Sequence, residues 1–263
     1  MKELPSISVV CPAYNSSTFI EQTLLSIINQ TRLPMEIIVV NDGSEDKTER
    51  IVENVFNEQC KTISSKLINI SHSGPGKARN IGILTAIGDW IAFIDSDDKW
   101  EETKIEKVSK LINTMPNVNF FCHNEKILNL DKSSSILNYK SNYSRSISLS
   151  KQLFKRNLFS TSAVVCRKDI IIKNGLFDES LQSAQDYELW LKLSNDINVY
   201  FIDEVLGTYL VRNNNITSMA KDKKLINSMK IIVKHRNKVS LLIFIISFIK
   251  ICIKYILFKF YIR

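Results

Sequence analysis

The sequence predicts an α/β fold in which a mostly parallel central sheet, Rossmann-like in its first half, is followed by a basic, apolar helical tail. Three observations support this expectation. Apolar runs of strand length alternate with segments of helical periodicity over the first hundred residues. These runs are apolar throughout, as in strands that are covered on both faces. The composition then changes near residue 218, where the tail is expected to begin.

The first hundred residues contain four apolar runs that we expect to be strands, at residues 7–11, 36–40, 67–70 and 90–94. A helix over residues 20–28 is expected to begin at a capping box formed by Thr18 and Glu21. Two further helices are expected before the third and fourth runs. Strands that alternate with helices in this way form a parallel sheet with helices on both faces.

The pattern loosens after about residue 115. We expect strands at residues 119–123, 162–166 and 198–202, and a short helix at residues 186–193. Residues 129–150 are rich in Ser, Asn and Lys, which is typical of a mobile loop region.

The charge is divided unevenly along the 263 residues. Residues 219–263 contain eleven Lys or Arg and one acid, so this tail carries a net charge of +10. The first 218 residues contain 24 basic and 26 acidic residues and carry −2. A slightly acidic body does not favour nucleic-acid binding, and the ordinary composition excludes disordered, collagen-like and multi-span membrane chains.

The five cysteines are scattered and form no CxxC pair, which favours buried free thiols in a reducing compartment. No signal peptide precedes the first apolar run, so we expect a cytoplasmic body. The three histidines have no acidic or Cys partners at ligand spacing, so no zinc site is predicted. His72 precedes a Gly/Pro turn and is either a site residue or an ordinary loop residue.

Polar segments follow three of the predicted strands, at residues 12–15, 41–44 and 95–98. Ligands of parallel α/β sheets bind at the carboxyl ends of the strands. Asp95 and Asp97 directly follow a buried strand, and paired carboxylates suit a hard cation such as Mg²⁺ or Mn²⁺. The alternative is an acidic turn that caps a helix beginning at Lys99.

The segment at residues 74–80 is a near miss to a dinucleotide-binding fingerprint. Arg79 stands where GxGxxG requires glycine, and the turn follows the third strand instead of the first, so an NAD site is rejected. Lys77 and Arg79 at a helix N-terminus would face a diphosphate, or would lie on a solvated helix face.

A series of motifs in fixed order resembles the family 2 glycosyltransferases of the GT-A nucleotide-sugar-binding fold. The motifs are SVVCPAYN at 8–15, IIVVNDGS at 37–44, GxARNxG at 76–82, DSDD at 95–98, GxFDE at 175–179 and QDYELW at 185–190. The resemblance spans residues 7–218 and is greatest to bacterial enzymes that assemble O-antigen and capsule repeat units.

The resemblance assigns roles to individual residues. It implies that Pro12, Ala13, Tyr14 and Asn15 contact the nucleotide, with Tyr14 stacking on uracil. It also places Asp42 on the base, Arg79 beside the nucleotide, and Asp95, Ser96 and Asp97 at the ribose and the metal-bound diphosphate. Asp97 is the expected direct ligand of Mn²⁺ or Mg²⁺.

The same resemblance implies inverting transfer from a UDP-sugar, a hexose or an N-acetylhexosamine, to an undecaprenyl-diphosphate-linked sugar. Asp186 would be the general base. Gln185 stands where many relatives have Glu, and it would lie near the acceptor. Trp190 is expected either to pack on the acceptor sugar or to fill the core.

One departure concerns residues 212–218. Many relatives have Arg-x-His here, with the histidine reaching the metal, whereas this chain has Arg212 and then Asn214 at the histidine position. Asn214 would offer an amide oxygen to the metal, or the loop would close over UDP through Arg212.

The tail suggests membrane attachment. Residues 239–249 carry no charge, but this run is shorter than the roughly 20 residues that span a bilayer. Lysines interrupt the apolar residues that follow, which favours a helix lying on an anionic leaflet. We therefore expect a domain at residues 1–218 and a tail at 219–263 that attaches peripherally to the cytoplasmic face of the bacterial inner membrane. A helix docked on the body or on a second subunit is the alternative.

Two other function classes remain open. A sugar nucleotidyltransferase would carry a glycine-rich, basic loop after the first strand, and residues 12–15 are not one. A non-catalytic nucleotide-sugar-binding homologue would not need Asp95, Asp97 and Asp186 together.

Overall fold

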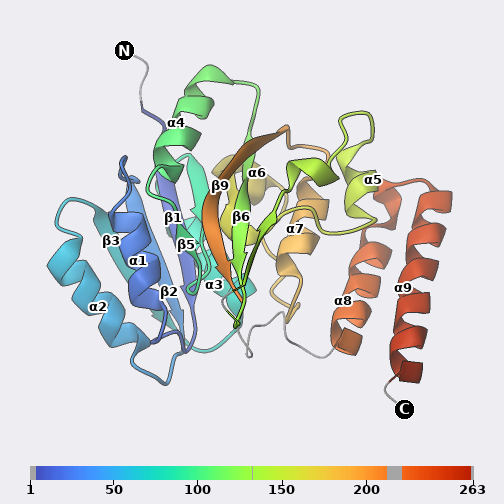
Figure 1. The fold of residues 1–263 in the computed structure, drawn as a ribbon, viewed down its shortest axis with the longest axis horizontal. Coiled ribbons are helices and arrows are strands. Elements are labelled where there is room, and N and C mark those ends of the chain that lie inside the picture. Colours follow the sequence, from blue (N-terminus) through green and yellow to red (C-terminus); the bar gives the residue numbers. More distant parts are fainter. Residues whose placement is uncertain (1–3, 132, 212–220, 262–263) are drawn as a thin grey trace.

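The computed structural model describes residues 4–131, 133–211 and 221–261 (Figure 1). The strands are β1 (Ile7–Ala13), β2 (Glu36–Asp42), β3 (Ser64–Ile70), β4 (Trp90–Phe93), β5 (Lys99–Trp100), β6 (Phe120–Leu128), β7 (Ser134–Leu137), β8 (Val164–Arg167) and β9 (Val199–Leu210). The α-helices are α1 (Ile20–Ile28), α2 (Thr48–Gln59), α3 (Pro75–Thr85), α4 (Lys104–Thr114), α5 (Leu149–Leu153), α6 (Lys168–Lys173), α7 (Gln185–Leu193), α8 (Lys221–Lys234) and α9 (Leu241–Tyr261). Short 3-10 turns lie at Lys140–Asn142, Thr161–Ala163 and Arg236–Lys238.

The described strands form one sheet in the order β3-β2-β1-β4-β8-β6-β9-β5, with β7 paired to β6. The first four strands in this order are parallel, and their register places Val9 beside Ile37 and Ala92. The predicted α/β fold with a mostly parallel sheet and a C-terminal helix is therefore confirmed. All four strands expected in the first hundred residues are present.

The second half of the sheet differs from the sequence prediction in four places. β8 pairs antiparallel to both β4 and β6, and β9 runs on to Leu210 because it pairs in parallel with β6 along most of its length. Residues 129–150 are not simply a loop, since they include β7 and the first two residues of α5. Lys99 belongs to the short strand β5 and begins no helix, so the helix-capping alternative for the acidic turn is wrong.

The predicted capping box at Thr18 is also wrong. α1 begins at Ile20 and has no side-chain cap. The Ser16 carbonyl instead accepts hydrogen bonds from the backbone N–H groups of Phe19 and Ile20, at 2.9 Å each. A backbone turn replaces the side-chain oxygen, so the start of the helix is set by the loop after β1.

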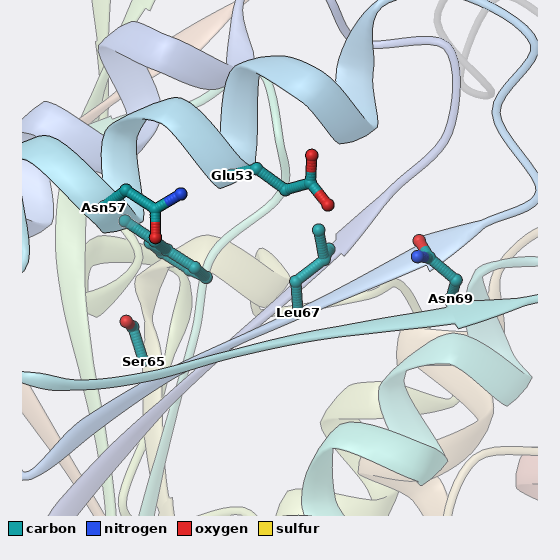
Figure 2. Close-up of a pocket in the computed structure, with 6 residues that line it drawn as sticks. Glu53, Asn57, Ser65, Leu67 and Asn69 are labelled. Carbon is teal, nitrogen blue, oxygen red and sulfur yellow. The ribbon is translucent and has the colours of Figure 1, made fainter.

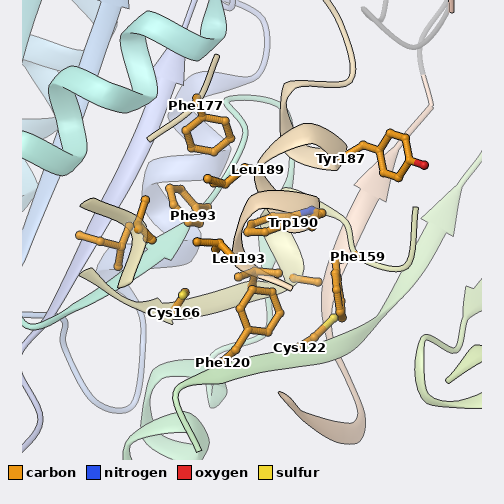
Figure 3. Close-up of a cluster of buried hydrophobic side chains, with 14 of the residues drawn as sticks. Phe93, Phe120, Cys122, Phe159, Cys166, Phe177, Tyr187, Leu189, Trp190 and Leu193 are labelled. Atoms are coloured by element: carbon orange, nitrogen blue, oxygen red, sulfur yellow. The ribbon is translucent and has the colours of Figure 1, made fainter. Parts of the chain in front are cut away.

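Two apolar layers enclose the sheet. α1, α2 and α4 cover one face through residues such as Leu24, Val52 and Val108. α3, α6 and α7 cover the other face, where Trp190 meets Phe93, Phe120 and Phe159 (Figure 3). Alternate residues of β1 serve the two layers, Val9 facing the first and Val10 the second. This pattern explains the continuously apolar strands.

The tail contains two helices that lie side by side at one end of the molecule (Figure 1). Ile231 and Ile232 of α8 are buried in the second apolar layer. Lys234 pairs with Asp178 and, at 2.8 Å, with Glu188 of α7. His235 Nε2 lies 3.0 Å from Glu188 Oε1. α8 is therefore docked on the body, and the division at residue 218 remains a prediction about domains.

Candidate functional site

The carboxyl ends of β1, β2 and β4 meet at one edge of the sheet, because these strands are parallel and adjacent. The segments that contain Tyr14, Asp42 and Asp95 follow or end these strands and therefore share this rim. Pro12 and Ala13 are the last two residues of β1, and they are buried beside Val40 and Asn41 of β2. They shape the rim through backbone position, while Tyr14 is exposed above it.

Tyr14 stacks on His72, with ring centroids 4.1 Å apart and an interplanar angle of 25°. His72 follows β3, so two loops that are far apart in the sequence bring these rings together. Asn15 follows Tyr14 in the loop after β1. Its backbone is left-handed (φ 46°), and its Oδ1 accepts the N–H of Glu45 at 2.9 Å. An Asn tolerates this backbone conformation better than most residues do. Asn15 therefore joins the β1 loop to the β2 loop.

Asp42 is buried, and its carboxylate holds the loop after β3. Oδ1 accepts the N–H of Ser73 and Oδ2 that of Gly74, each at 2.8 Å, and His72 Nδ1 lies 3.0 Å from Oδ2. Gly43 is required beside it, because its φ of +70° is left-handed and an added Cβ would lie 2.7 Å from the His72 backbone nitrogen. Asp42 thus organises the surface on which Tyr14 and His72 stack.

Arg79 projects from α3 to Asp95, with its Nη2 donating to Oδ1 at 2.6 Å. The Arg79 side chain is almost wholly buried, and its Nε has no hydrogen-bond partner within the described part of the chain. Its guanidinium also lies 5.4 Å from the centre of the Phe177 ring. Of the two interpretations of this segment, the structure favours a site-facing Arg79 over a solvated one.

Hydrogen bonds to buried serine hydroxyl groups hold the DSDD turn in place. The Asp95 N–H donates to Ser162 Oγ at 3.0 Å, and that hydroxyl donates to buried Asp98. Ser96 is also buried, with its hydroxyl 2.6 Å from Ser16 Oγ, so its side chain faces inward instead of toward a ligand. Asp95 and Asp97 are the partly exposed carboxylates of the turn.

A buried polar cluster lies beneath this turn. Burial, reinforced by the neighbouring carboxylates, raises the pKa of Asp98 well above its usual range. Burial lowers the pKa of Lys104, whose Nζ donates to the Ser162 carbonyl at 2.8 Å and lies 3.6 Å from the Trp100 ring centre. Burial also raises the pKa of Glu125. Ser162 connects this cluster to the rim.

Asp186 lies in the first turn of α7 and is partly buried. Burial raises its pKa, while the Tyr187 backbone N–H, the positive charge of Arg79 and a hydrogen bond from Asn157 act to lower it. Ala184, two residues before Asp186 and at the N-cap of α7, has a left-handed backbone (φ 61°). Such strain in a non-glycine residue persists only where the surroundings impose it, and it is common near functional sites.

The two predicted acceptor residues are both buried. This favours the core alternative for Trp190, whereas contact of Gln185 with the acceptor stays a prediction. Trp190 is 0% exposed among the rings of Phe93, Phe120 and Phe159, and the core alternative holds. Gln185 is also buried, and its Nε2 donates to the Leu181 carbonyl at 2.7 Å. Trp190 therefore has no surface to offer a ligand.

The remaining predicted residues, Arg212 and Asn214, lie outside the described residues. The structure adds three residues that the sequence analysis did not assign: His72, Asn157 and Ser162. His72 had a visible signal, its place before the Gly/Pro turn. Asn157 and Ser162 had none, because their partners lie 29 and 64 or more residues away.

The residues present fit a hard divalent cation. Asp95 and Asp97 supply carboxylate oxygens, and Asp95 already shares Oδ1 with Arg79. Across residues 4–131, 133–211 and 221–261, no group of three or more His, Cys, Asp or Glu could hold a metal ion by itself. A Mg²⁺ or Mn²⁺ ion that keeps waters and takes substrate phosphates needs only one or two protein carboxylates.

A hollow of about 340 Å³ lies elsewhere, between α2 and β3. Glu53 and Asn57 face Ser65, Leu67 and Asn69 across it (Figure 2). None of the predicted site residues lines this hollow. It adjoins the rim only through Asn69, whose Oδ1 accepts a hydrogen bond from Asn41 Nδ2 at 2.9 Å.

Comparison with known proteins identifies the family. The family model described as glycosyl transferase family 2 matches residues 8–181. An uncharacterized glycosyltransferase of Rickettsia typhi is 31% identical over 219 residues, which cover 82% of this chain and 67% of that protein. The chain belongs to glycosyl transferase family 2.

One further relative and one solved structure are similar to this chain. The putative teichuronic acid biosynthesis glycosyltransferase TuaG of Bacillus subtilis is 26% identical over 81% of this chain and 82% of its own length. S. aureus TarS 1-349, in complex with UDP-GlcNAc, has the same fold: TM-score 0.69, 21% identity, 87% of this chain and 66% of that one. This chain thus spans about two thirds of the Rickettsia and TarS chains.

Proposed function

We propose that the protein transfers a sugar from a UDP-sugar, a hexose or an N-acetylhexosamine, to a hydroxyl group of a lipid-diphosphate-linked sugar, with inversion at the anomeric carbon. The observation that carries the proposal is the meeting of Tyr14, Arg79, Asp95 and Asp186 from four different segments around one sheet edge. The TarS complex with UDP-GlcNAc supports a UDP-linked donor.

Different residues would contact the base, contact the diphosphate and accept the proton. Tyr14, with His72, offers an aromatic surface for the base, and the loop held by Asp42 sets its position. The Arg79 guanidinium, which donates to Asp95 at the rim, would bring a positive charge beside the diphosphate. Asp186 would accept the proton of the acceptor hydroxyl as that oxygen attacks the anomeric carbon and UDP departs.

Asp97 and Asp95 would hold a Mn²⁺ or Mg²⁺ ion. A divalent cation there would offset the negative charge on the departing diphosphate. Asn214, at the position of the histidine in many relatives, is proposed as a further contact to the metal, and Arg212 as a contact to UDP.

An undecaprenyl-diphosphate-linked acceptor and a role in O-antigen or capsule repeat-unit assembly follow from the motif resemblance. The similarity to TuaG supports a role in bacterial polysaccharide synthesis. An acceptor of this kind is anchored in the membrane, so the enzyme would act at the cytoplasmic face of the inner membrane.

The exposed face of α9 supports membrane attachment. Helix α9 is long and apolar enough to cross a membrane by length and composition, with a mean hydropathy of 2.4 over Leu241–Phe258. One of its faces packs against α8 and the apolar layer that α8 joins, through Ile243, Phe244, Phe248 and Ile251. The opposite face exposes Leu241, Leu242, Ile245, Ile246, Ile249, Ile253, Ile256 and Leu257. A helix packed along one side favours lying in the membrane surface over spanning the bilayer.

Lys250 and Lys254 are exposed beside this apolar face. Lysines at this position would meet anionic headgroups, each contributing about 1 kcal/mol near the surface. Flotation with anionic vesicles tests this: the full chain should float, and a chain ending at Val239, which keeps the docked α8, should fold and stay in solution. Equal flotation of the two would place the membrane contact elsewhere.

A donor screen tests the function as a whole. UDP release is measured for the full chain with UDP-hexoses and UDP-N-acetylhexosamines and a synthetic sugar-diphosphate-lipid acceptor. Asp186→Asn should keep UDP affinity while lowering kcat by about 10²–10⁴-fold. Loss of UDP affinity with unchanged kcat would make Asp186 a binding residue and refute the mechanism.

A further inference from the structure

Asn157, in the loop after α5, contacts the proposed base directly. Its Nδ2 donates to Asp186 Oδ2 at 2.8 Å, although the two residues are 29 positions apart. Asn157 is exposed and Asp186 is partly buried, so the contact lies at the surface of the site instead of in the core. No motif of the resemblance includes Asn157.

The orientation of the Asn157 amide is set by the backbone. Its Oδ1 accepts the N–H of Phe159 at 3.2 Å. Because an amide side chain has one acceptor oxygen and one donor nitrogen, this bond turns Nδ2 toward Asp186. Phe159 is itself held in the core, where its ring packs on Phe120 and Trp190. A rigid part of the fold therefore aims a neutral donor at the carboxylate.

Such a donor affects both the charge and the direction of Asp186. Burial raises the pKa of Asp186, and the charged groups that face it are Arg79 from α3, which favours the carboxylate, and Asp95 at the end of β4, which opposes it. The Asn157 hydrogen bond favours the ionised form without adding a charge. It also fixes the rotation of the carboxyl group about its bond to Cβ.

We propose that Asn157 is a positioning residue for the base: its hydrogen bond favours the ionised form of Asp186 and holds the carboxylate in one orientation for proton transfer from the acceptor hydroxyl. This inference rests on the proposed function, in which Asp186 is the base. The proton passes from the acceptor oxygen to Asp186, and Asn157 neither gains nor loses one.

The test compares Asn157→Ala and Asn157→Asp with the unchanged chain, using kcat and KM across pH 5–9. Asn157→Ala should lower kcat about 10- to 100-fold, the range for losing a hydrogen bond to a charged group. The acidic limb of kcat/KM should move to higher pH, while the KM for the donor changes little. Asn157→Asp should move the limb further, because a second carboxylate opposes ionisation of Asp186.

A matched control is Asn142→Ala, an asparagine from the same region whose amide contacts Arg156 and not the base. It should leave both kcat and the pH profile unchanged. The inference is overturned if Asn157→Ala behaves like Asn142→Ala, or if it abolishes UDP binding measured by calorimetry. An Asp186→Asn variant that keeps kcat would instead refute the base assignment, so the two failures are distinguishable.

Discussion

Replacing Asp42 with asparagine tests whether this carboxylate organises the nucleotide-facing rim. Asp42 is 2% exposed, and its two oxygens accept the N–H groups of Ser73 and Gly74 at 2.8 Å each. Asparagine has the same shape but only one acceptor oxygen. One backbone N–H would therefore face the side-chain NH₂, a donor against a donor.

The magnitude follows from these two bonds. A hydrogen bond to a charged group contributes about 1.5–3 kcal/mol, and Asp42→Asn would lose one such bond. Ser73 is exposed and Gly74 half-buried, so water can reach the N–H that is released. Since the remaining bond to the neutral amide persists in weakened form, we expect Asp42→Asn to lower the free energy of unfolding by about 2–4 kcal/mol. For a domain of this size, that corresponds to a fall in Tm of about 4–16 °C.

The assay is urea unfolding together with thermal unfolding, with and without UDP. Glu45→Gln is the matched control, because Glu45 is exposed two residues beyond Gly43 and loses the same charge. It should change the free energy of unfolding by no more than about 0.5 kcal/mol. If Asp42→Asn is as stable as Glu45→Gln, the Asp42 carboxylate does not hold the loop after β3.

Three further predictions concern other parts of the chain. Gly82→Ala should destabilise by about 1–3 kcal/mol in urea unfolding, because the added Cβ would lie 2.5 Å from Val10 Cγ1; unchanged stability would show that α3 shifts freely. Burial raises the pKa of Asp178, but hydrogen bonds from Lys234 and Ser180 outweigh this and lower it to about 2, so stability present above pH 4 should be lost as pH falls toward 2. In Lys234→Ala, the free energy of unfolding should fall less between pH 4 and pH 2. The same pH dependence in both proteins would show that the Lys234–Asp178 pair does not cause the loss. Asp97→Ala should abolish turnover, and it should weaken UDP binding only when Mn²⁺ or Mg²⁺ is present. Full turnover of the unchanged protein in EDTA would contradict the metal assignment.

The sequence by itself determined the parallel half of the sheet and the rim. Four continuous apolar runs are a local signal, and the carboxyl ends of parallel strands always share an edge. The positions of Tyr14, Asp42 and Asp95 follow from that rule and from the order of the motifs. The second half of the sheet mixes parallel and antiparallel pairs and was less predictable, because the pairing of β8 and β9 depends on neighbours distant in the sequence.

Only the tertiary structure decided how individual side chains are used. Trp190 and Gln185 lie on the helix that carries Asp186, and helical spacing cannot tell which polar or aromatic side chain faces the rim and which faces the core. The hydrogen bond from Asn157 to Asp186 joins segments whose separation no local pattern encodes. The docking of α8 by Lys234 and His235 on Glu188 likewise required the folded molecule, because an ion pair depends on distance in space and not on distance along the chain.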